Sequence, residues 1–347
     1  ARIDASWELD VFGRIRRATE SARAQVLAAD ETRRAVILSI VTGVASSYIF
    51  LRALDRQLEI ARATARNYGE TLRIFELRFK AGTVSRVEVT QVQSQYQQAL
   101  ATIPAFERQI QVQENLISIL LGRNPAPIPR GRTIDRLALP GIPADLPSGL
   151  LERRPDIGAA EQALISANAQ IGVARSFYYP TISLTSLLGT SSAALSSLFT
   201  GPASIWLLSA AATAPIFTFG NIEGQVETAE AAQREAVERY RQTIQAAFRE
   251  VNDALIGTQA SRAELRARSE RVLALQEYAR LARRRFDEGV SGYLEVLIAQ
   301  NDLFSAELAH AQTQADSLTQ IVNVYKARGG GGVLEAERLA PAVPRQG

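Results

Sequence analysis

The sequence predicts a mainly α-helical fold with membrane β-barrel strands, built as two tandem copies of one long structural unit. When the chain is shifted by 207 residues, it matches its own second half without a gap. Phe12-Gly13 aligns with Phe219-Gly220, and Arg78-Phe79 aligns with Arg285-Phe286. One constant offset over such a length indicates an internal repeat. The distribution of proline and one long uncharged segment then predict where the helices and strands lie.

The repeat divides the chain into four segments. The first copy covers residues 1–122 and the second 151–329, while 123–150 form an equatorial linker and 330–347 an equatorial tail. The second copy opens with residues 152–207, which have no counterpart in the first. We therefore expect at least one helix and one strand of the first copy to precede residue 1, together with any signal peptide.

Stretches without proline predict two very long helices. All 13 prolines lie within residues 104–215 or beyond residue 340. The remaining stretches are rich in Ala, Gln, Glu, Arg and Leu, which favour helices. Residues 222–288 are predicted as one helix about 100 Å long at roughly 1.5 Å per residue, with a counterpart at 14–81. Helices of this length need partner helices along most of their surface.

Each long helix is predicted to end at a short glycine turn, followed by a returning helix. The turns centre on Gly82 and Gly289, and the returning helices are expected at 87–121 and 293–328; a further helix is expected at 152–178. Apolar residues of the first returning helix alternate by three and four, which is typical of a coiled-coil seam. The seam consists of Val89, Val92, Tyr96, Ala99, Ile103, Phe106, Ile110, Ile117 and Leu120.

The strands are predicted from alternation of apolar and polar residues. Residues 2–11 alternate throughout, and residues 181–188 and 204–216 lie in an uncharged segment, 176–222, whose prolines argue against a transmembrane helix. A strand with one apolar and one polar face suits a membrane β-barrel with a watery lumen. The alternative is a half-buried strand of a soluble sheet. We assign to the lipid face Ile3, Trp7, Leu9, Ile182 and Leu184.

Composition argues against catalysis, metal binding and nucleic-acid binding. The chain has no cysteine, one histidine and a formal net charge of +3. Glu88 and Glu295 are paired by the repeat, and paired carboxylates can perform acid–base chemistry. No nucleophile triad, phosphate-binding loop or metal-ligand cluster accompanies them in the sequence. We therefore predict no enzyme activity, no cofactor and no metal site.

Several strings resemble a known family. Trp7-Glu-Leu-Asp-Val-Phe-Gly-Arg14 and Leu151-Glu-Arg-Arg-Pro-Asp-Ile157 look like signatures of the outer-membrane factors of Gram-negative efflux pumps, which have the TolC fold. OprM/NodT-type lipoproteins of resistance-nodulation-division pumps are the most similar group. The resemblance covers residues 1–332. It implies a homotrimer with a 12-stranded barrel and a 12-helix periplasmic tunnel. The lipid-bearing cysteine of the family would precede residue 1.

The resemblance also implies a function and partners. The chain would be the outer-membrane exit duct of a tripartite pump that exports drugs or other small amphiphilic compounds. Its partners would be two further copies, a periplasmic adaptor (membrane fusion) protein, an inner-membrane pump and outer-membrane lipid, with no nucleic acid. A type I protein-secretion channel and a heavy-metal efflux duct are alternatives. A soluble coiled-coil scaffold is a more remote one, which the uncharged segment opposes.

By the same resemblance, two groups of residues would form functional sites at the glycine turns. The first group would dock the adaptor: Gly82, Thr83, Gly289 and Val290. The second group would form the periplasmic gate: Glu88 and Glu295, where the family carries aspartates, with Tyr293 adding bulk. Ile298 stands where the family often has another acidic residue. The alternative interpretation is that both glutamates are solvated charges on helix N-terminal turns, where the dipole favours them.

Overall fold

The structure is a computed structural model that describes residues 1–137, 153–194, 196, 198–199 and 201–330. The predicted tail beyond residue 330 and the later part of the predicted linker, from residue 138, therefore lie outside the described residues. The same holds for the first two residues of the Leu151–Ile157 string.

Contacts divide the chain into two compact units. One unit combines Ala1–Ala35 with Arg154–Ala247, and the other combines Val36–Arg153 with Phe248–Gly347. Each unit takes part of both repeat copies. Each long helix runs from one unit into the other.

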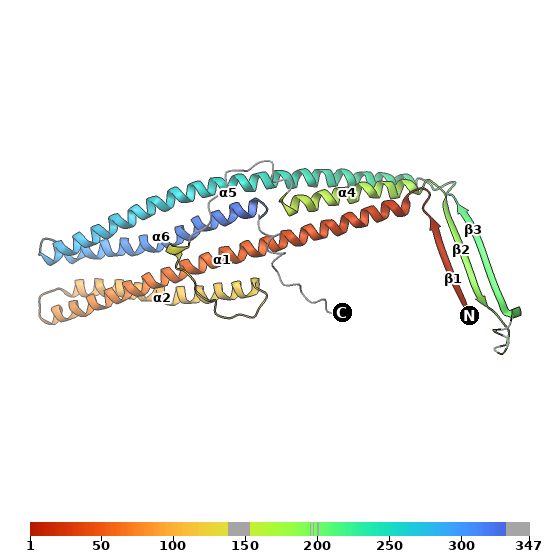
Figure 1. Ribbon diagram of the computed structural model, residues 1–347. Coiled ribbons are helices and arrows are strands. Elements are labelled where there is room, and N and C mark those ends of the chain that lie inside the picture. Colours follow the sequence, from red (N-terminus) through yellow and green to blue (C-terminus); the bar gives the residue numbers. More distant parts are fainter. Residues whose placement is uncertain (138–152, 195, 197, 200, 331–347) are drawn as a thin grey trace. The chain divides into compact units, whose positions relative to one another are not determined.

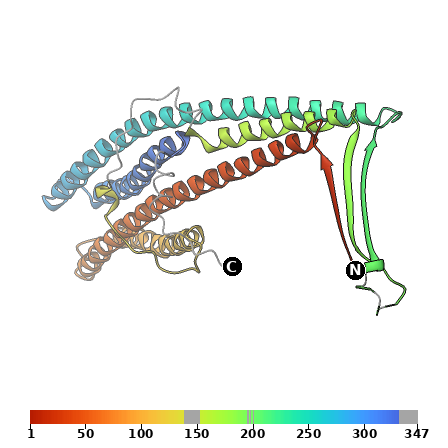
Figure 2. The ribbon, with the colours of Figure 1, turned by 45° about the vertical axis from the view of Figure 1, so that its right-hand side comes forward.

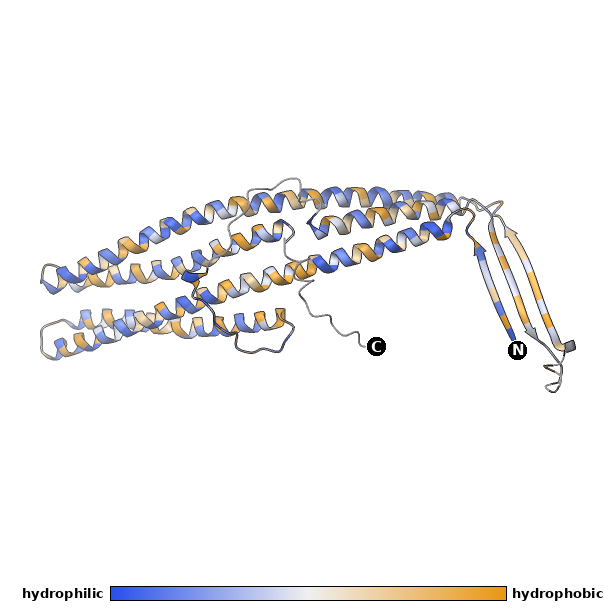
Figure 3. Cartoon of the chain, viewed as in Figure 1, coloured by the Kyte–Doolittle hydropathy of each residue, from blue (hydrophilic) through white to orange (hydrophobic). Residues whose placement is uncertain are grey.

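The first unit contains an antiparallel sheet of three strands. The strands β1 (Arg2–Leu9), β2 (Thr181–Thr190) and β3 (Ser204–Thr213) lie side by side in the order β1-β2-β3 (Figures 1 and 2). Hydrophobic and hydrophilic residues alternate along β1 and the first half of β2, whereas β3 is mostly hydrophobic (Figure 3). The strands predicted from alternation are confirmed.

The start of the first long helix explains why β1 ends earlier than predicted. The helix α1 (Arg14–Lys80) begins with backbone N–H groups of Ile15 and Arg16 that donate to the Asp10 carboxylate, at 2.8 and 2.9 Å. The first N–H groups of a helix have no partner within the helix, and an acidic side chain there satisfies them. Asp10 therefore leaves the strand pattern, and β1 stops at Leu9.

A short helix covers the beginning of α1 within the first unit. The helix α4 (Pro155–Ser176) has proline at its first position, where the missing N–H costs nothing. The Ser21 and Ser166 hydroxyls are both buried and hydrogen-bond to each other at 2.8 Å. The predicted helix at 152–178 is therefore confirmed, with slightly shorter bounds.

The other helices repeat with the offset seen in the sequence. The second long helix is α5 (Asn221–Asp287), and the returning helices are α2 (Arg86–Leu120) and α6 (Tyr293–Ala327). The first and last residues of α5 are those of α1 plus 207, and the first and last residues of α6 are those of α2 plus 207. The predicted bounds of all four helices are correct to within one residue.

The predicted coiled-coil seam of α2 packs inside the second unit. Val92, Ala99 and Ile117 are almost completely buried, and Tyr96 and Ile103 are partly buried against the same clusters. Along α1, the seam contacts Leu51 and Leu54 in one cluster. The seam is thus the core of the α1–α2 pair.

One apolar segment of α1 is left uncovered by the chain. An 18-residue window of this helix has a mean hydropathy of 1.7, which is enough to cross a membrane by length and composition, yet only 17% of it is buried. Residues 35–51 carry no charge, and Val36 and Val41 are more than half exposed. Contiguous exposed apolar surface of this kind marks an interaction surface. Sequence reasoning did not single out this segment.

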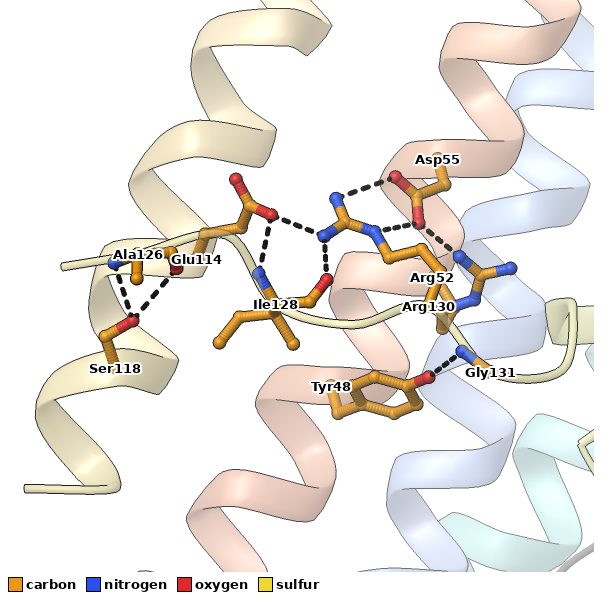
Figure 4. Close-up of polar contacts among 9 residues, drawn as sticks. All are labelled: Tyr48, Arg52, Asp55, Glu114, Ser118, Ala126, Ile128, Arg130 and Gly131. Carbon is orange, nitrogen blue, oxygen red and sulfur yellow. Dashed lines mark hydrogen bonds and ion pairs between the residues drawn. The ribbon is translucent and has the colours of Figure 1, made fainter. Parts of the chain in front are cut away.

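A polar clasp holds the segment after α2 onto α1 and α2 (Figure 4). The Arg130 guanidinium donates to the Asp55 carboxylate of α1, with Nε–Oδ2 at 3.0 Å, and also pairs with Glu114 of α2. The Ile128 N–H donates to Glu114 at 3.0 Å, and the Gly131 N–H donates to the Tyr48 hydroxyl at 2.8 Å. These contacts satisfy backbone groups of an irregular segment and fix its path.

The clasp makes a prediction about acid stability. Burial acts to raise the pKa of Glu114, but hydrogen bonds from Arg130 and the Ile128 N–H outweigh it, so the pKa lies below the usual 4.5. The stabilisation by ionised Glu114 is fully present above pH 4.5, and it is lost as the pH falls through the lower pKa that Glu114 has in the folded protein. Glu114→Gln should lower the free energy of unfolding by roughly 1–2 kcal/mol at pH 7, measured by chemical denaturation with helical circular dichroism.

A matched control is available between the same two helices. Arg62 and Glu107 also pair, at 2.6 Å, but both side chains are about half exposed. Glu107→Gln should therefore change stability by less than about 0.5 kcal/mol. Equal effects of the two variants, or a Glu114→Gln effect that does not shrink as the pH falls below 4.5, would contradict this account of the clasp.

Candidate functional site

The predicted lipid-facing residues lie on one face of the sheet. In the strand register, Trp7 is opposite Leu184 and Leu9 is opposite Ile182. Ile3 belongs to the same face, because side chains two residues apart in a strand point the same way. All five predicted residues therefore share a face, which fits the assignment to lipid.

The register extends this face to Leu188, which alternation along β2 already places with Ile182 and Leu184, and onto β3. Leu188 stands opposite both Ile3 and Trp206, and Leu208 follows on β3. Trp206 is 77% exposed and Leu208 70% exposed. Pairing across strands, which sequence alone does not give, joins them into one continuous apolar surface.

The opposite face of the sheet is mostly polar. Asp4, Ser6 and Glu8 of β1 alternate with the apolar set, and Ser6 lies opposite Thr185 of β2. Leu187 and Leu207 interrupt the polar character next to Asp4. A sheet with one apolar and one polar face can separate lipid from water.

Exposed aromatic side chains gather where the strands meet the helices in the first unit. Phe12 and Tyr179 stack with ring centroids 4.8 Å apart, and Phe217 and Phe219 form an edge contact at 4.3 Å. Sequence reasoning missed this group, although aromatic residues beside strand ends give a readable signal. Aromatic rings at this position are typical of a membrane–water boundary.

The first glycine turn, between α1 and α2, is a helix cap. Gly82 has φ +73°; its N–H donates to the Phe79 carbonyl at 2.9 Å, and the Thr83 N–H donates to the Arg78 carbonyl at 2.9 Å. These two bonds define a Schellman motif, whose positive φ favours glycine. The Thr83 hydroxyl also donates to the Arg78 carbonyl.

The second turn, between α5 and α6, has the same geometry. Gly289 has φ +76°, and its N–H donates to the Phe286 carbonyl at 3.0 Å, while the Val290 N–H donates to the Arg285 carbonyl at 2.8 Å. A Cβ added at Gly82 or Gly289 would meet no heavy atom within 4 Å. Val290 is 65% exposed. Both turns therefore present accessible backbone.

Glu88 performs a local structural task. Its carboxylate accepts the Ser85 N–H at 2.7 Å, while its own N–H donates to the Ser85 hydroxyl at 3.3 Å. This reciprocal pair is a capping box at the start of α2. Glu88 thus serves its helix end, as the alternative interpretation expects, and its side chain is only partly exposed.

Glu295 has a different environment although the repeat pairs it with Glu88. The residue at the N-cap of α6 is Gly292, the counterpart of Ser85, and it has no side chain to form a cap. Glu295 instead lies 3.8 Å from the Arg285 guanidinium. Glu88 and Glu295 are each followed by a residue of one buried cluster, Val89 and Val296. The structure therefore brings the starts of α2 and α6 together.

Tyr293 is placed differently from the prediction. Its side chain is 2% exposed, so it does not line an opening beside Glu295. The ring packs against Phe75 of α1 and Phe286 of α5, with centroid distances of 4.3 and 5.0 Å. Residues i and i+2 of a helix point to different sides, which separates Tyr293 from Glu295.

Among the described residues, no group of three or more His, Cys, Asp or Glu side chains lies close enough to hold a metal ion. The one histidine, His310, shares a 3.0 Å hydrogen bond with the Ser269 hydroxyl.

The unequal caps generate a paired prediction. Ser85→Ala should destabilise the start of α2 by about 1 kcal/mol, because it removes the capping bond. Gly292→Ser should create a capping box with Glu295 and stabilise α6 by a few tenths of a kcal/mol up to about 1 kcal/mol. The φ of Gly292 is −74° and a Cβ there meets nothing within 4 Å, so serine fits without strain.

Hydrogen exchange of the amides at the start of each helix measures both effects. Protection should fall at α2 in Ser85→Ala and rise at α6 in Gly292→Ser. Changes of the same sign in the two variants would contradict the assignment of the caps.

Comparison with known proteins connects this geometry with a family. Residues 1–123 and 146–330 match the sequence profile of the family described as outer membrane efflux protein. The solvent efflux pump outer membrane protein SrpC of Pseudomonas putida is 38% identical over 327 residues, which cover 94% of this chain and 70% of SrpC. The cation efflux system protein CusC of Escherichia coli O6:H1 is 34% identical, covering 95% of this chain and 72% of CusC.

A solved structure agrees with these relatives. The open state of the Neisseria gonorrhoeae MtrE outer membrane channel superposes with a TM-score of 0.87 and is 32% identical, covering 94% of this chain and 74% of MtrE. The fold is therefore TolC-like, and the chain is an outer-membrane protein and not an enzyme. On the match of residues 1–123 and 146–330 and on its identity to these relatives, the chain belongs to the outer membrane efflux protein family.

Proposed function

We propose that the chain is the exit duct of a tripartite efflux pump of the resistance-nodulation-division type. The observation that carries this proposal is the three-stranded sheet, because its continuous apolar face is exposed while its opposite face carries Asp4, Ser6 and Glu8. Such a sheet suits a barrel wall between lipid and an aqueous duct.

We further propose that three copies assemble around one duct. Three strands leave two unpaired sheet edges, which a closed barrel would remove. In the second unit, the uncharged segment 35–51 of α1 leaves apolar side chains exposed. Neighbouring copies would cover both. Four strands from each copy, as in the 12-stranded barrel that the sequence resemblance implies, would complete the wall.

The cargo that we propose is small amphiphilic or apolar compounds. The relative named as a solvent efflux pump component supports this class, at 38% identity. A second candidate is cations, supported by the relative named as part of a cation efflux system, at 34% identity. The duct itself would carry no ATPase and no energy source, since nothing among the described residues resembles a nucleotide site.

Deletion of the gene distinguishes these cargoes. The deletion strain should become more sensitive to several unrelated dyes, antibiotics or organic solvents, and the intact gene should restore growth. Sensitivity to metal salts alone would favour cations, and loss of secretion of one protein would favour a type I secretion channel. Unchanged growth in all conditions would contradict the proposed function.

The glycine turns are proposed as docking sites for the hairpins of a periplasmic adaptor. Gly82, Thr83, Gly289 and Val290 are exposed, and nothing lies within 4 Å of a Cβ added at either glycine. Absence of a Cβ permits close approach of another backbone.

Gly82→Trp and Gly289→Trp should each reduce export to the level of the deletion strain, because the indole would block this approach. The matched control is Gly201→Trp in the loop between β2 and β3, where a Cβ also meets nothing within 4 Å. Membrane insertion and assembly, followed by fractionation and native mass, should be unchanged in all three. Full drug resistance in both turn variants would refute docking.

The gate is proposed to consist of Glu88 and Glu295 from each copy. Six carboxylates around one opening would favour cations, as acidic rings do in other channels. Glu88→Gln with Glu295→Gln should weaken cation selectivity and block by divalent ions in single-channel recordings. Glutamine can replace glutamate in a capping box, so the start of α2 should stay folded. Unchanged selectivity would mean that both carboxylates only serve their helix ends.

A further inference from the structure

Two tyrosine hydroxyls are buried without a hydrogen bond in the cluster where α1, α2, α5 and α6 meet. Tyr68 of α1 and Tyr293 of α6 are each 2% exposed. Neither hydroxyl has a hydrogen-bond partner. Both residues belong to one buried cluster with Phe75, Val89 and Val296.

The pKa values agree with the geometry. Burial raises the pKa of Tyr68 to about 12, and the nearby Tyr293 adds to the shift. Burial also raises the pKa of Tyr293. The Thr71 hydroxyl lies close enough to favour ionised Tyr293, but the two hydroxyls do not form a hydrogen bond of normal geometry. The two phenols thus share a buried and weakly polar environment.

The rings of the two tyrosines stabilise the packed cluster, whereas their hydroxyls destabilise it. The Tyr293 ring stabilises the cluster through its contacts with Phe75 and Phe286. Each unpaired hydroxyl weakens the same packing, because water would hydrogen-bond it in a more open arrangement. The effect of one such group corresponds to about tenfold in the equilibrium between packed and open states. Phenylalanine would keep the ring and remove the opposing effect.

We propose that Tyr68 and Tyr293 are positioning residues that keep the packed arrangement of the tip cluster only marginally favoured, so that the duct can open. This inference rests on the proposed function. Tyr293 lies two residues before Glu295 at the start of α6, so its packing fixes the helix end that carries this glutamate. A relative has been crystallised in an open state, and an equilibrium between two states would be sensitive to such a bias.

The test uses the purified full-length protein with Tyr68→Phe, Tyr293→Phe and the double variant. Each single variant should raise the melting temperature by roughly 2–4 °C and lower the open probability in planar bilayers about tenfold. Most core substitutions lower stability, so a gain in stability with a loss of opening is a distinctive result. Ser291→Ala, which removes another buried hydroxyl without a partner at the same turn, should act in the same direction.

Tyr48→Phe is the matched control in the second unit. The Tyr48 hydroxyl accepts the Gly131 N–H, so its removal should lower the melting temperature and leave opening unchanged. The inference is overturned if Tyr68→Phe and Tyr293→Phe fail to raise the melting temperature, or if they raise it without reducing opening. If the wild-type protein conducts no current, the proposed function is overturned. The melting temperatures of the variants would in that case still show whether the hydroxyls weaken the packing.

Discussion

The structure depends on apolar surface that a single chain does not bury. The strand face that contains Trp7, Leu188 and Trp206 is exposed, and only 17% of the apolar segment of α1 is buried. Exposed surface of this extent is unstable in water. Lipid suits the first surface because it lies on strands with a polar opposite face. Other copies of the chain suit the second surface, on α1, because the rest of the same chain packs against only one side of this helix.

The repeat supplies two nearly identical turns, but the helices that follow them are capped differently. Ser85 and Glu88 close a capping box at the start of α2, whereas Gly292 leaves the start of α6 without a side-chain cap. Tyr293 then adds a buried hydroxyl without a partner. After the duplication, the start of α2 has a side-chain cap for its backbone N–H groups and the start of α6 has none. Both starts adjoin the same buried cluster. A local difference of this kind allows two equal folds to serve different roles.

Much of the fold could be predicted from the sequence because it rests on local signals. The glycines at 82 and 289 end the long helices, and strict alternation identifies β1. The error at the end of β1, at Asp10, arose because a capping side chain interrupts the pattern. Pairing across strands and the Arg130 clasp were not predictable, since they join residues far apart in the chain without any periodic signal.

The candidate site was predicted less well, for a geometric reason. Tyr293 is close to Glu295 in sequence, but two residues along a helix correspond to a rotation of about 200°. The tyrosine therefore points into the cluster with Phe75 and Phe286 and not beside the carboxylate. The role of Glu88 in its own cap was visible in the string Ser85-Arg-Val-Glu88, which matches a capping box.

Spin-label accessibility along β2 tests the assignment of the strand faces most directly. The chain has no cysteine, so single cysteines can be introduced without removing others. Labels at 182, 184 and 188 in lipid vesicles should collide mainly with oxygen, which concentrates in lipid, and labels at 183 and 185 with a water-soluble nickel complex. An alternation with a period of two residues is the expected result. Equal accessibility of neighbouring positions to the nickel complex would contradict a sheet with one face in lipid and one in an aqueous duct.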